Sequence, residues 1–159
     1  MMILSLTPKN IKHNKDNDGL RTIVANAMVL FIKLNTIHYL IKGLSFREVH
    51  KKTERYYEYM KAIYDELNER LVQMEDKPIK SLGCLSKYRY MIEDFVDDSC
   101  NTMKAYECIY EDFKVMSSLI CKELDRIKKT DDVVTEDILI EYKKWFSKEI
   151  WMLKATIDI

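Results

Sequence analysis

Residues 34 to 75 contain two helical patterns separated by a very short turn, and this hairpin limits the folds that the chain can adopt. Gly43 is placed to end the first helix as its C′ residue. Ser45, followed three residues later by Glu48, matches a capping box that would start the second helix. Because the connection is short, the two helices must run antiparallel. The pattern predicts a pair of long helices as a building unit of the fold.

The rest of the chain continues the helical pattern with few breaks. Only 3 Gly and 2 Pro occur among 159 residues, which favours long helices. Apolar residues at helical spacing predict four of them, at about 20–43, 46–74, 101–128 and 133–157. The link from 75 to 100 is too long for a loop in a compact domain, so we expect a short helix near 82–91. The sequence therefore predicts an all-α domain over residues 20–159, preceded by a tail over residues 1–19.

Two of the three histidines lie at matching distances from the predicted turn. His38 is five residues before Gly43, and His50 is five residues after Ser45. At the rise of a helix, both rings lie about 7 Å from the turn, so they should face one another. Glu54 follows His50 by one turn on the same helix face. These three side chains are candidate ligands of a metal ion.

Asp65 and Glu69 repeat the four-residue spacing further along the second helix. Positions 50, 54, 65 and 69 fall at roughly 0°, 40°, 60° and 100° around the axis, which is one continuous stripe. Residue 65 is nevertheless about 22 Å along the axis from residue 50, so one helix cannot place both pairs around one ion. A second copy of the chain, related by a two-fold axis, can bring the two pairs together and form two identical sites. The spacing predicts a site that only an oligomer completes.

Four short motifs along the chain, taken together, are typical of one family. They read H-Y-x-x-K-G-x-x-F-x-x-x-H at 38–50, D-E-x-x-E-R at 65–70, D-D-x-x-T-x-D-I-L at 131–139 and W-M-L-K-A at 151–155. These motifs resemble the Dps family, the dodecameric mini-ferritins. The resemblance covers nearly the whole chain beyond about residue 20.

The resemblance implies an all-α, ferritin-like four-helix bundle, with a short extra helix in the crossover between the second and third long helices. It also implies a ferroxidase whose iron ligands are His38, His50, Glu54, Asp65 and Glu69. In the family, Fe(II) is oxidised at sites between subunits, with hydrogen peroxide preferred over dioxygen. The Fe(III) product is stored as a mineral inside a hollow dodecamer built from two-fold dimers, which protects against oxidative stress.

Position 39 departs from the family pattern. Tyr39 stands where the family usually has tryptophan. That ring is thought to lie near the iron centre and to absorb stray oxidising equivalents. The resemblance therefore leaves the role of Tyr39 open.

An acidic cluster begins the last predicted helix, formed by Asp131, Asp132, Glu136 and Asp137. In the family, acidic residues of this region line a threefold pore through which iron enters the shell. Acidic residues in a first turn also complement the helix dipole without any further role. Both interpretations remain open from the sequence.

The charge of the chain bears on the alternative function of the family, a non-enzymatic shell that compacts DNA and keeps only a vestigial or structural metal site. Lys plus Arg equals Asp plus Glu at 26 each, so the formal net charge is zero and no overall field attracts nucleic acid. The tail carries Lys9, Lys12 and Lys15 but also Asp16 and Asp18. A DNA partner is possible, yet this mixed tail favours ordinary surface charge over phosphate contacts.

The location of the protein is predicted from what the sequence lacks. The first ten residues have no basic region before their apolar run, so we expect no secretory signal. Polar residues interrupt the apolar run of the first helix, which argues against a membrane span. We therefore expect a cytoplasmic protein whose four cysteines are reduced thiols, namely Cys84, Cys100, Cys108 and Cys121.

Overall fold

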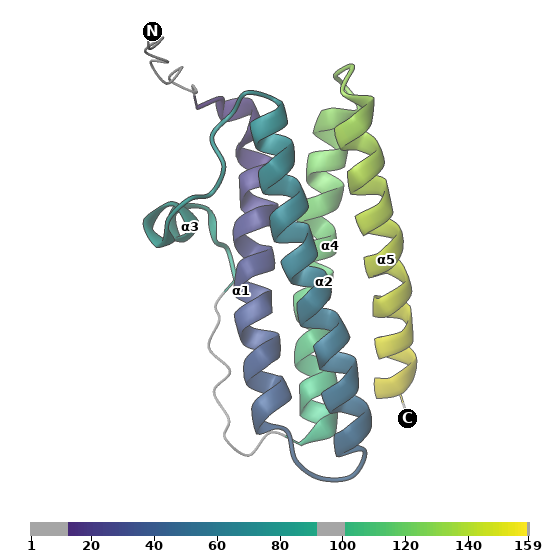
Figure 1. Cartoon of the computed structure of the whole chain (residues 1–159). Helices are drawn as coiled ribbons and strands as arrows, with labels where there is room; N and C mark the ends of the chain where they lie inside the picture. The colour runs from purple at the N-terminus through teal and green to yellow at the C-terminus, as the bar shows by residue number, and fades with distance from the viewer. Residues whose placement is uncertain (1–12, 92–100, 159) are drawn as a thin grey trace, which may run out of the picture.

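In the part of the chain that the structure describes, four long helices and one short helix form the fold (Figure 1). The structure is a computed structural model and describes residues 13–91 and 101–158. The long helices are α1 (Asp18–Leu40), α2 (Phe46–Gln73), α4 (Thr102–Ile127) and α5 (Val133–Ile157). The short helix α3 (Leu82–Tyr88) lies between α2 and α4, and a single 3-10 turn, η1 (Lys15–Asn17), precedes α1. The predicted all-α bundle with a short crossover helix is confirmed.

Polar side chains cap α3, α4 and α5. At the start of α3, the side chain of Ser81 accepts a hydrogen bond of 3.2 Å from the backbone N–H of Cys84. The side chain of Asn101 accepts a hydrogen bond of 2.9 Å from the backbone N–H of Lys104 at the start of α4. The side chain of Asp132 likewise accepts a hydrogen bond of 3.0 Å from the backbone N–H of Thr135 at the start of α5. Such caps satisfy N–H groups that have no partner within the helix, so they define where the helix begins.

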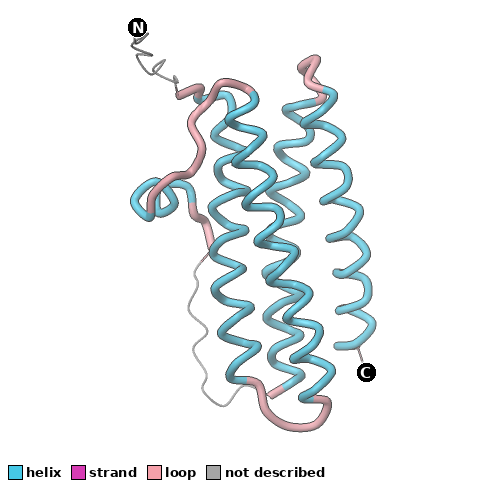
Figure 2. The backbone as a smooth tube through the Cα atoms, viewed as in Figure 1, coloured by secondary structure: helices cyan, strands magenta, loops and turns pink. Residues whose placement is uncertain are grey.

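In the connection between α2 and α4, the short helix α3 lies beside α1 (Figure 2). α1 and α2 are antiparallel and meet at the turn of residues 41–45. An isolated parallel bridge joins Lys42 in that turn to Asn101, so α4 begins at the same end of the bundle as α2. The two helices therefore point the same way, and the chain between them must return across the bundle. The four long helices thus run up–down–down–up, which is typical of ferritin-like bundles with one long crossover rather than of simple up-and-down bundles.

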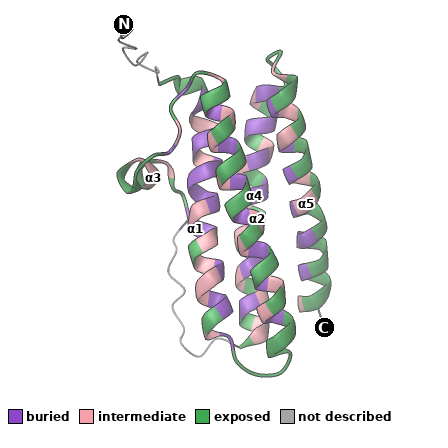
Figure 3. Ribbon diagram, in the orientation of Figure 1, coloured by how far each residue is buried: buried purple, intermediate pink, exposed green. Residues whose placement is uncertain are grey.

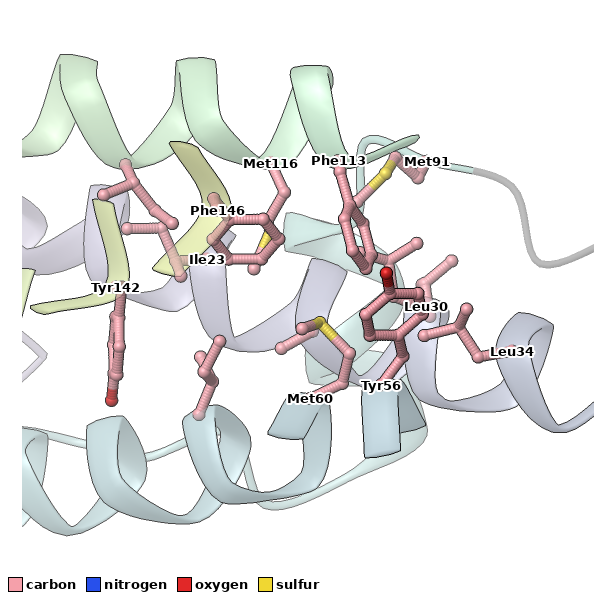
Figure 4. Packing of buried hydrophobic residues seen from close by; sticks show 14 of the residues in the cluster. Ile23, Leu30, Leu34, Tyr56, Met60, Met91, Phe113, Met116, Tyr142 and Phe146 are labelled. Carbon is pink, nitrogen blue, oxygen red and sulfur yellow. The ribbon is translucent and has the colours of Figure 1, made fainter. Parts of the chain in front are cut away.

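The core lies between the four long helices (Figure 4). α1 contributes Ile23 and Leu30, α2 contributes Met60, and α4 and α5 contribute Phe113 and Phe146, each 1% exposed or less. The rings of Phe113 and Phe146 meet edge to face, with centroids 5.2 Å apart. Each fully buried side chain of this kind contributes about 1.5–3 kcal/mol to folding.

α1 is buried on more than one side, as predicted from its sequence (Figure 3). By length and composition alone, Lys15–Leu40 could cross a membrane. However, 56% of its most apolar window is buried in the bundle, where α1 packs against α2 and α4. Its role as the core helix of the bundle accounts for its composition.

The start of the bundle is fixed by a buried carboxylate. Asp76, just after α2, forms an ion pair with Arg21 of α1, and both side chains are at most 2% exposed. Asp76 also accepts hydrogen bonds from the Asn14 backbone at 3.0 Å and from the Asn17 side chain at 2.7 Å. α1 thus begins at Asp18, two residues earlier than expected, and residues 1–12 of the predicted tail lie outside the described residues.

Candidate metal centre

The turn between α1 and α2 differs in detail from the sequence prediction. α1 ends at Leu40, and the next residue, Ile41, is extended with φ −61° and ψ 142°. Gly43 therefore lies inside the turn, at φ +107°, and is not the C′ residue of the helix. This glycine reverses the chain in a region that residues with a side chain rarely adopt.

The predicted capping box is wrong. Ser45 adopts a left-handed conformation with φ 62° and ψ 16°, and its side chain makes no capping hydrogen bond. A serine needs an extended backbone to direct its hydroxyl at the first turn of a helix. Here the carbonyl oxygen of Ser45 instead accepts hydrogen bonds from the backbone N–H groups of Glu48 and Val49, at 3.0 and 3.1 Å.

The two predicted histidines lie directly against one another across this turn. The rings of His38 and His50 are stacked, with centroids 3.6 Å apart and planes 21° from parallel. Nδ1 of His38 lies 2.8 Å from the backbone oxygen of His50, and Nδ1 of His50 lies 3.0 Å from the backbone oxygen of His38. Each histidine is therefore held by the backbone of the other.

These reciprocal hydrogen bonds decide which ring nitrogen carries the proton. A backbone carbonyl oxygen can only accept, so each Nδ1 must be the donor. In the neutral ring, Nε2 then keeps its lone pair, which is the form of imidazole that binds a metal ion. A backbone carbonyl on the opposite nitrogen is also the usual way in which proteins orient metal-binding histidines. The pair is thus prepared to supply two nitrogen ligands.

Aromatic rings surround the histidine pair. Tyr57 contacts His38 edge to face with centroids 5.4 Å apart, and Tyr39 does so at 5.6 Å. The ring of Phe46 contacts that of His50, with centroids 5.1 Å apart. Tyr39 is 71% exposed, so its ring only partly covers the site. Tyr57 was missed from the sequence, although its position seven residues after His50 places it near the same face.

The three predicted carboxylates lie on the outer side of α2. Its buried side chains form the opposite face, namely Val49, Thr53, Tyr56, Met60, Ile63, Leu67 and Leu71. Glu54, Asp65 and Glu69 are all exposed. Asp65 borders two surface hollows, and Glu69 lines one of them together with Asn68 and Val72. The predicted stripe therefore faces outward, where a second molecule can reach it.

One copy of the chain does not gather these residues around a single point. Within residues 13–91 and 101–158, no three His, Cys, Asp or Glu side chains lie close enough to hold one metal ion. This agrees with the distance along α2, which separates the histidine end of the stripe from the Asp65 end. The donor set still suits a metal ion, because imidazole and carboxylate together bind first-row transition metals.

The acidic residues at the start of α5 play different roles. Asp132 caps α5 and forms an ion pair with Arg70 of α2 at 2.7 Å. Burial alone would raise the pKa of Asp132, but hydrogen bonds from Thr135 and the Arg70 charge hold the pKa below its usual value. Asp131 and Asp137 are exposed and Glu136 is partly exposed. Asp132 thus joins α2 to α5, whereas Asp131, Glu136 and Asp137 take no part in the ion pair with Arg70.

The cysteines described by the structure are unpaired thiols. Cys84, Cys108 and Cys121 are free and only partly exposed. Burial raises the pKa of the Cys108 thiol, and the nearby Asp112 charge adds to this effect. Cys100 lies outside the described residues.

Comparisons with known proteins identify the family. The ferritin-like domain family matches residues 17–159. A DNA protection during starvation protein from Helicobacter pylori is 32% identical over 136 residues, which cover 86% of this chain and 94% of that protein. The chain belongs to the Dps family of the ferritin-like superfamily.

Solved structures of similar proteins have the same fold. Antigen TpF1 from Treponema pallidum is 28% identical, with a TM-score of 0.86 over 91% of this chain and 92% of its own. Dps from Staphylococcus aureus is 25% identical, with a TM-score of 0.85 over 93% of this chain and 99% of its own. The Dps resemblance stated from the motifs is thereby confirmed, and the chain is a mini-ferritin of this family.

Proposed function

We propose that this Dps protein is a ferroxidase that sequesters iron, with each iron site shared between two copies of the chain. The observation that carries the proposal is the stacked pair His38 and His50, whose Nε2 atoms keep their lone pairs beside an outward-facing carboxylate stripe. In a two-fold dimer, His38, His50 and Glu54 of one subunit would face Asp65 and Glu69 of the partner subunit. Each dimer would then hold two sites.

The chemistry follows from these ligands. Neutral imidazole and carboxylate ligands that leave coordination positions open suit Fe(II). A structural zinc site, by contrast, is closed by four protein ligands. Negative carboxylates stabilise Fe(III) more than Fe(II), so they favour oxidation. With hydrogen peroxide, two Fe(II) ions and two protons give two Fe(III) ions and two water molecules. Because both electrons reach the peroxide together, little hydroxyl radical is released, and the Fe(III) product can be stored as mineral in a hollow dodecamer.

The surface beside the stripe supports pairing with a second copy. A hollow between α1 and α2 is lined mainly by apolar side chains, with three charged ones beside them: Met28, Phe31, Ala62 and Tyr64, together with Glu58, Lys61 and Asp65. Ile32 on the same side of α1 is 45% exposed. An apolar surface of this kind suits burial in an interface between subunits. The interface would lie where the proposed iron sites need it.

The test is Fe(II) oxidation by stoichiometric hydrogen peroxide, measured on the assembly purified by size. The His50→Ala/Asp65→Ala double variant should lose fast oxidation while keeping the size of the assembly. Glu107→Ala, which removes an exposed carboxylate of α4, is the matched control and should oxidise iron normally. A double variant that oxidises Fe(II) at the unaltered rate would refute these ligands.

A further inference from the structure

The hydroxyl group of Thr53 lies at the centre of the hydrogen bonds that join the two histidines. Thr53 is fully buried, three residues after His50 on α2. Its Oγ1 lies 2.9 Å from the backbone oxygen of His50 and 2.9 Å from that of Val49. The same atom lies 3.2 Å from Nδ1 of His38 on the neighbouring helix. One hydroxyl thus contacts the ring of one histidine and the backbone of the other.

The single hydrogen of this hydroxyl can satisfy only some of these neighbours. Both carbonyl oxygens are acceptors, so the hydroxyl donates its hydrogen toward them. The lone pairs of Thr53 Oγ1 then face His38, so a hydrogen bond between the two forms only if Nδ1 of His38 carries a hydrogen. Nδ1 of His38 therefore meets two acceptors, the His50 carbonyl oxygen and Thr53 Oγ1. The opposite tautomer would place its lone pair against the carbonyl oxygen at 2.8 Å with no hydrogen between them.

We propose that Thr53 is a positioning residue of the metal centre: its Oγ1 is a second acceptor for Nδ1–H of His38, and it strengthens the preference, already favoured by the His50 carbonyl oxygen, for the tautomer in which Nε2 is the metal-binding atom. The inference rests on the proposed function. Thr53 itself binds no metal, and it acts only through His38. Its acceptor oxygen also makes Nε2 a better ligand, because a hydrogen bond at one ring nitrogen raises the basicity of the other.

An ordinary structural role for Thr53 makes a different prediction. Threonine in a helix commonly donates to the carbonyl three or four residues earlier, and this has no effect on a neighbouring ring. With that role alone, removing the hydroxyl would change the stability of α2 and leave both the tautomer and metal affinity unaltered. The contact between Oγ1 and the His38 ring is what separates the two possibilities.

Two variants isolate the hydroxyl. Thr53→Ser and Thr53→Ala both lose the γ-methyl group, and they differ from each other only in the oxygen atom. Valine is unsuitable, because a methyl group in place of Oγ1 would press on two carbonyl oxygens that lie 2.9 Å away. The first measurement is the tautomer of His38 in the metal-free assembly, by magic-angle-spinning NMR with ¹⁵N-labelled histidine rings. The second is the affinity for zinc, by calorimetry.

The serine variant should keep hydrogen on Nδ1 of His38 and bind zinc like the unaltered protein. The alanine variant should gain a population with hydrogen on Nε2 and bind zinc about tenfold more weakly. Equal tautomers and equal affinities in the two variants would overturn the role of Thr53. If the unaltered protein bound no metal, the proposed function would fail, whereas the tautomer measurement would still decide the contact between Thr53 and His38.

Discussion

Asp76 shows how one residue holds segments that are distant in the sequence. Burial alone would raise its pKa, but hydrogen bonds from Asn14, Asn17 and Lys77 and the charge of Arg21 hold its pKa below the usual 3.8. A lowered pKa means that the folded state favours the ionised carboxylate. Its contribution to stability is therefore complete above the unfolded pKa and disappears as the pH falls through the lower, folded pKa.

Asp76→Asn should destabilise the protein by up to about 3–5 kcal/mol near neutral pH, because the buried Arg21 charge loses its buried partner and keeps only the partly exposed Asp18 at 3.0 Å. The free energy of unfolding, measured by denaturant titration, checks this value. The gap in the free energy of unfolding between the variant and the unaltered protein should begin to narrow as the pH falls below about 4, the ordinary pKa of an aspartate in the unfolded chain. It should close only once the pH has passed through the lower pKa of the folded state, where native Asp76 also becomes neutral. Asp125→Asn, which removes an exposed carboxylate of α4, is the control and should change stability by less than about 0.5 kcal/mol. A gap that stays constant with pH would contradict the ion-pair explanation.

At the scale of elements, the turn between α1 and α2 sets the register of the two histidines. It contains two residues in left-handed conformations, Gly43 at φ +107° and Ser45 at φ 62°. A side chain at position 43 would meet no other atom within 4 Å, so any cost there comes from the backbone alone. At position 43 it is therefore the backbone conformation, and not packing, that favours glycine.

Gly43→Ala should therefore cost about 1–2 kcal/mol, because alanine rarely adopts this backbone conformation. Ser45→Gly should be neutral or slightly stabilising, since glycine relieves the strain of a left-handed serine. The melting temperatures of both variants, compared with the unaltered protein, check the opposite signs. A stable Gly43→Ala variant would show that the turn tolerates another conformation.

The helices were predictable from the sequence because their burial follows a simple period. The bounds of α5 agree with the prediction, and those of α4 differ by one residue at each end. The turn was less predictable, since Ser45 and Glu48 have the right spacing for a capping box but the backbone of Ser45 has the wrong conformation for one. Local sequence gives the residue types of a cap, whereas the geometry of the returning helix decides whether the cap forms.

At the scale of the whole molecule, some features of the candidate site were predictable from the sequence and others were not. That His38 and His50 face one another followed from their equal distances to the turn, and the shared stripe of Glu54, Asp65 and Glu69 followed from the helical period. The roles of Asp76 and Thr53 did not follow, because each depends on contacts between separate helices or loops. Periodic features were accessible from the sequence, and hydrogen-bond networks across the bundle required the structure.

If each iron site is shared between two chains, two inactive variants should restore part of the activity when they assemble together. His50→Ala and Asp65→Ala should each abolish fast iron oxidation when present alone, because every site lacks one ligand. In a dimer of one chain of each kind, one site carries both substitutions and the other carries none. Random pairing makes about half of the dimers mixed, so co-expression of the two variants should restore about a quarter of the active sites. The oxidation rate per subunit, measured on the mixed assembly, checks this fraction. If all five ligands came from one chain, mixing would restore nothing, because each chain would still carry its own defect.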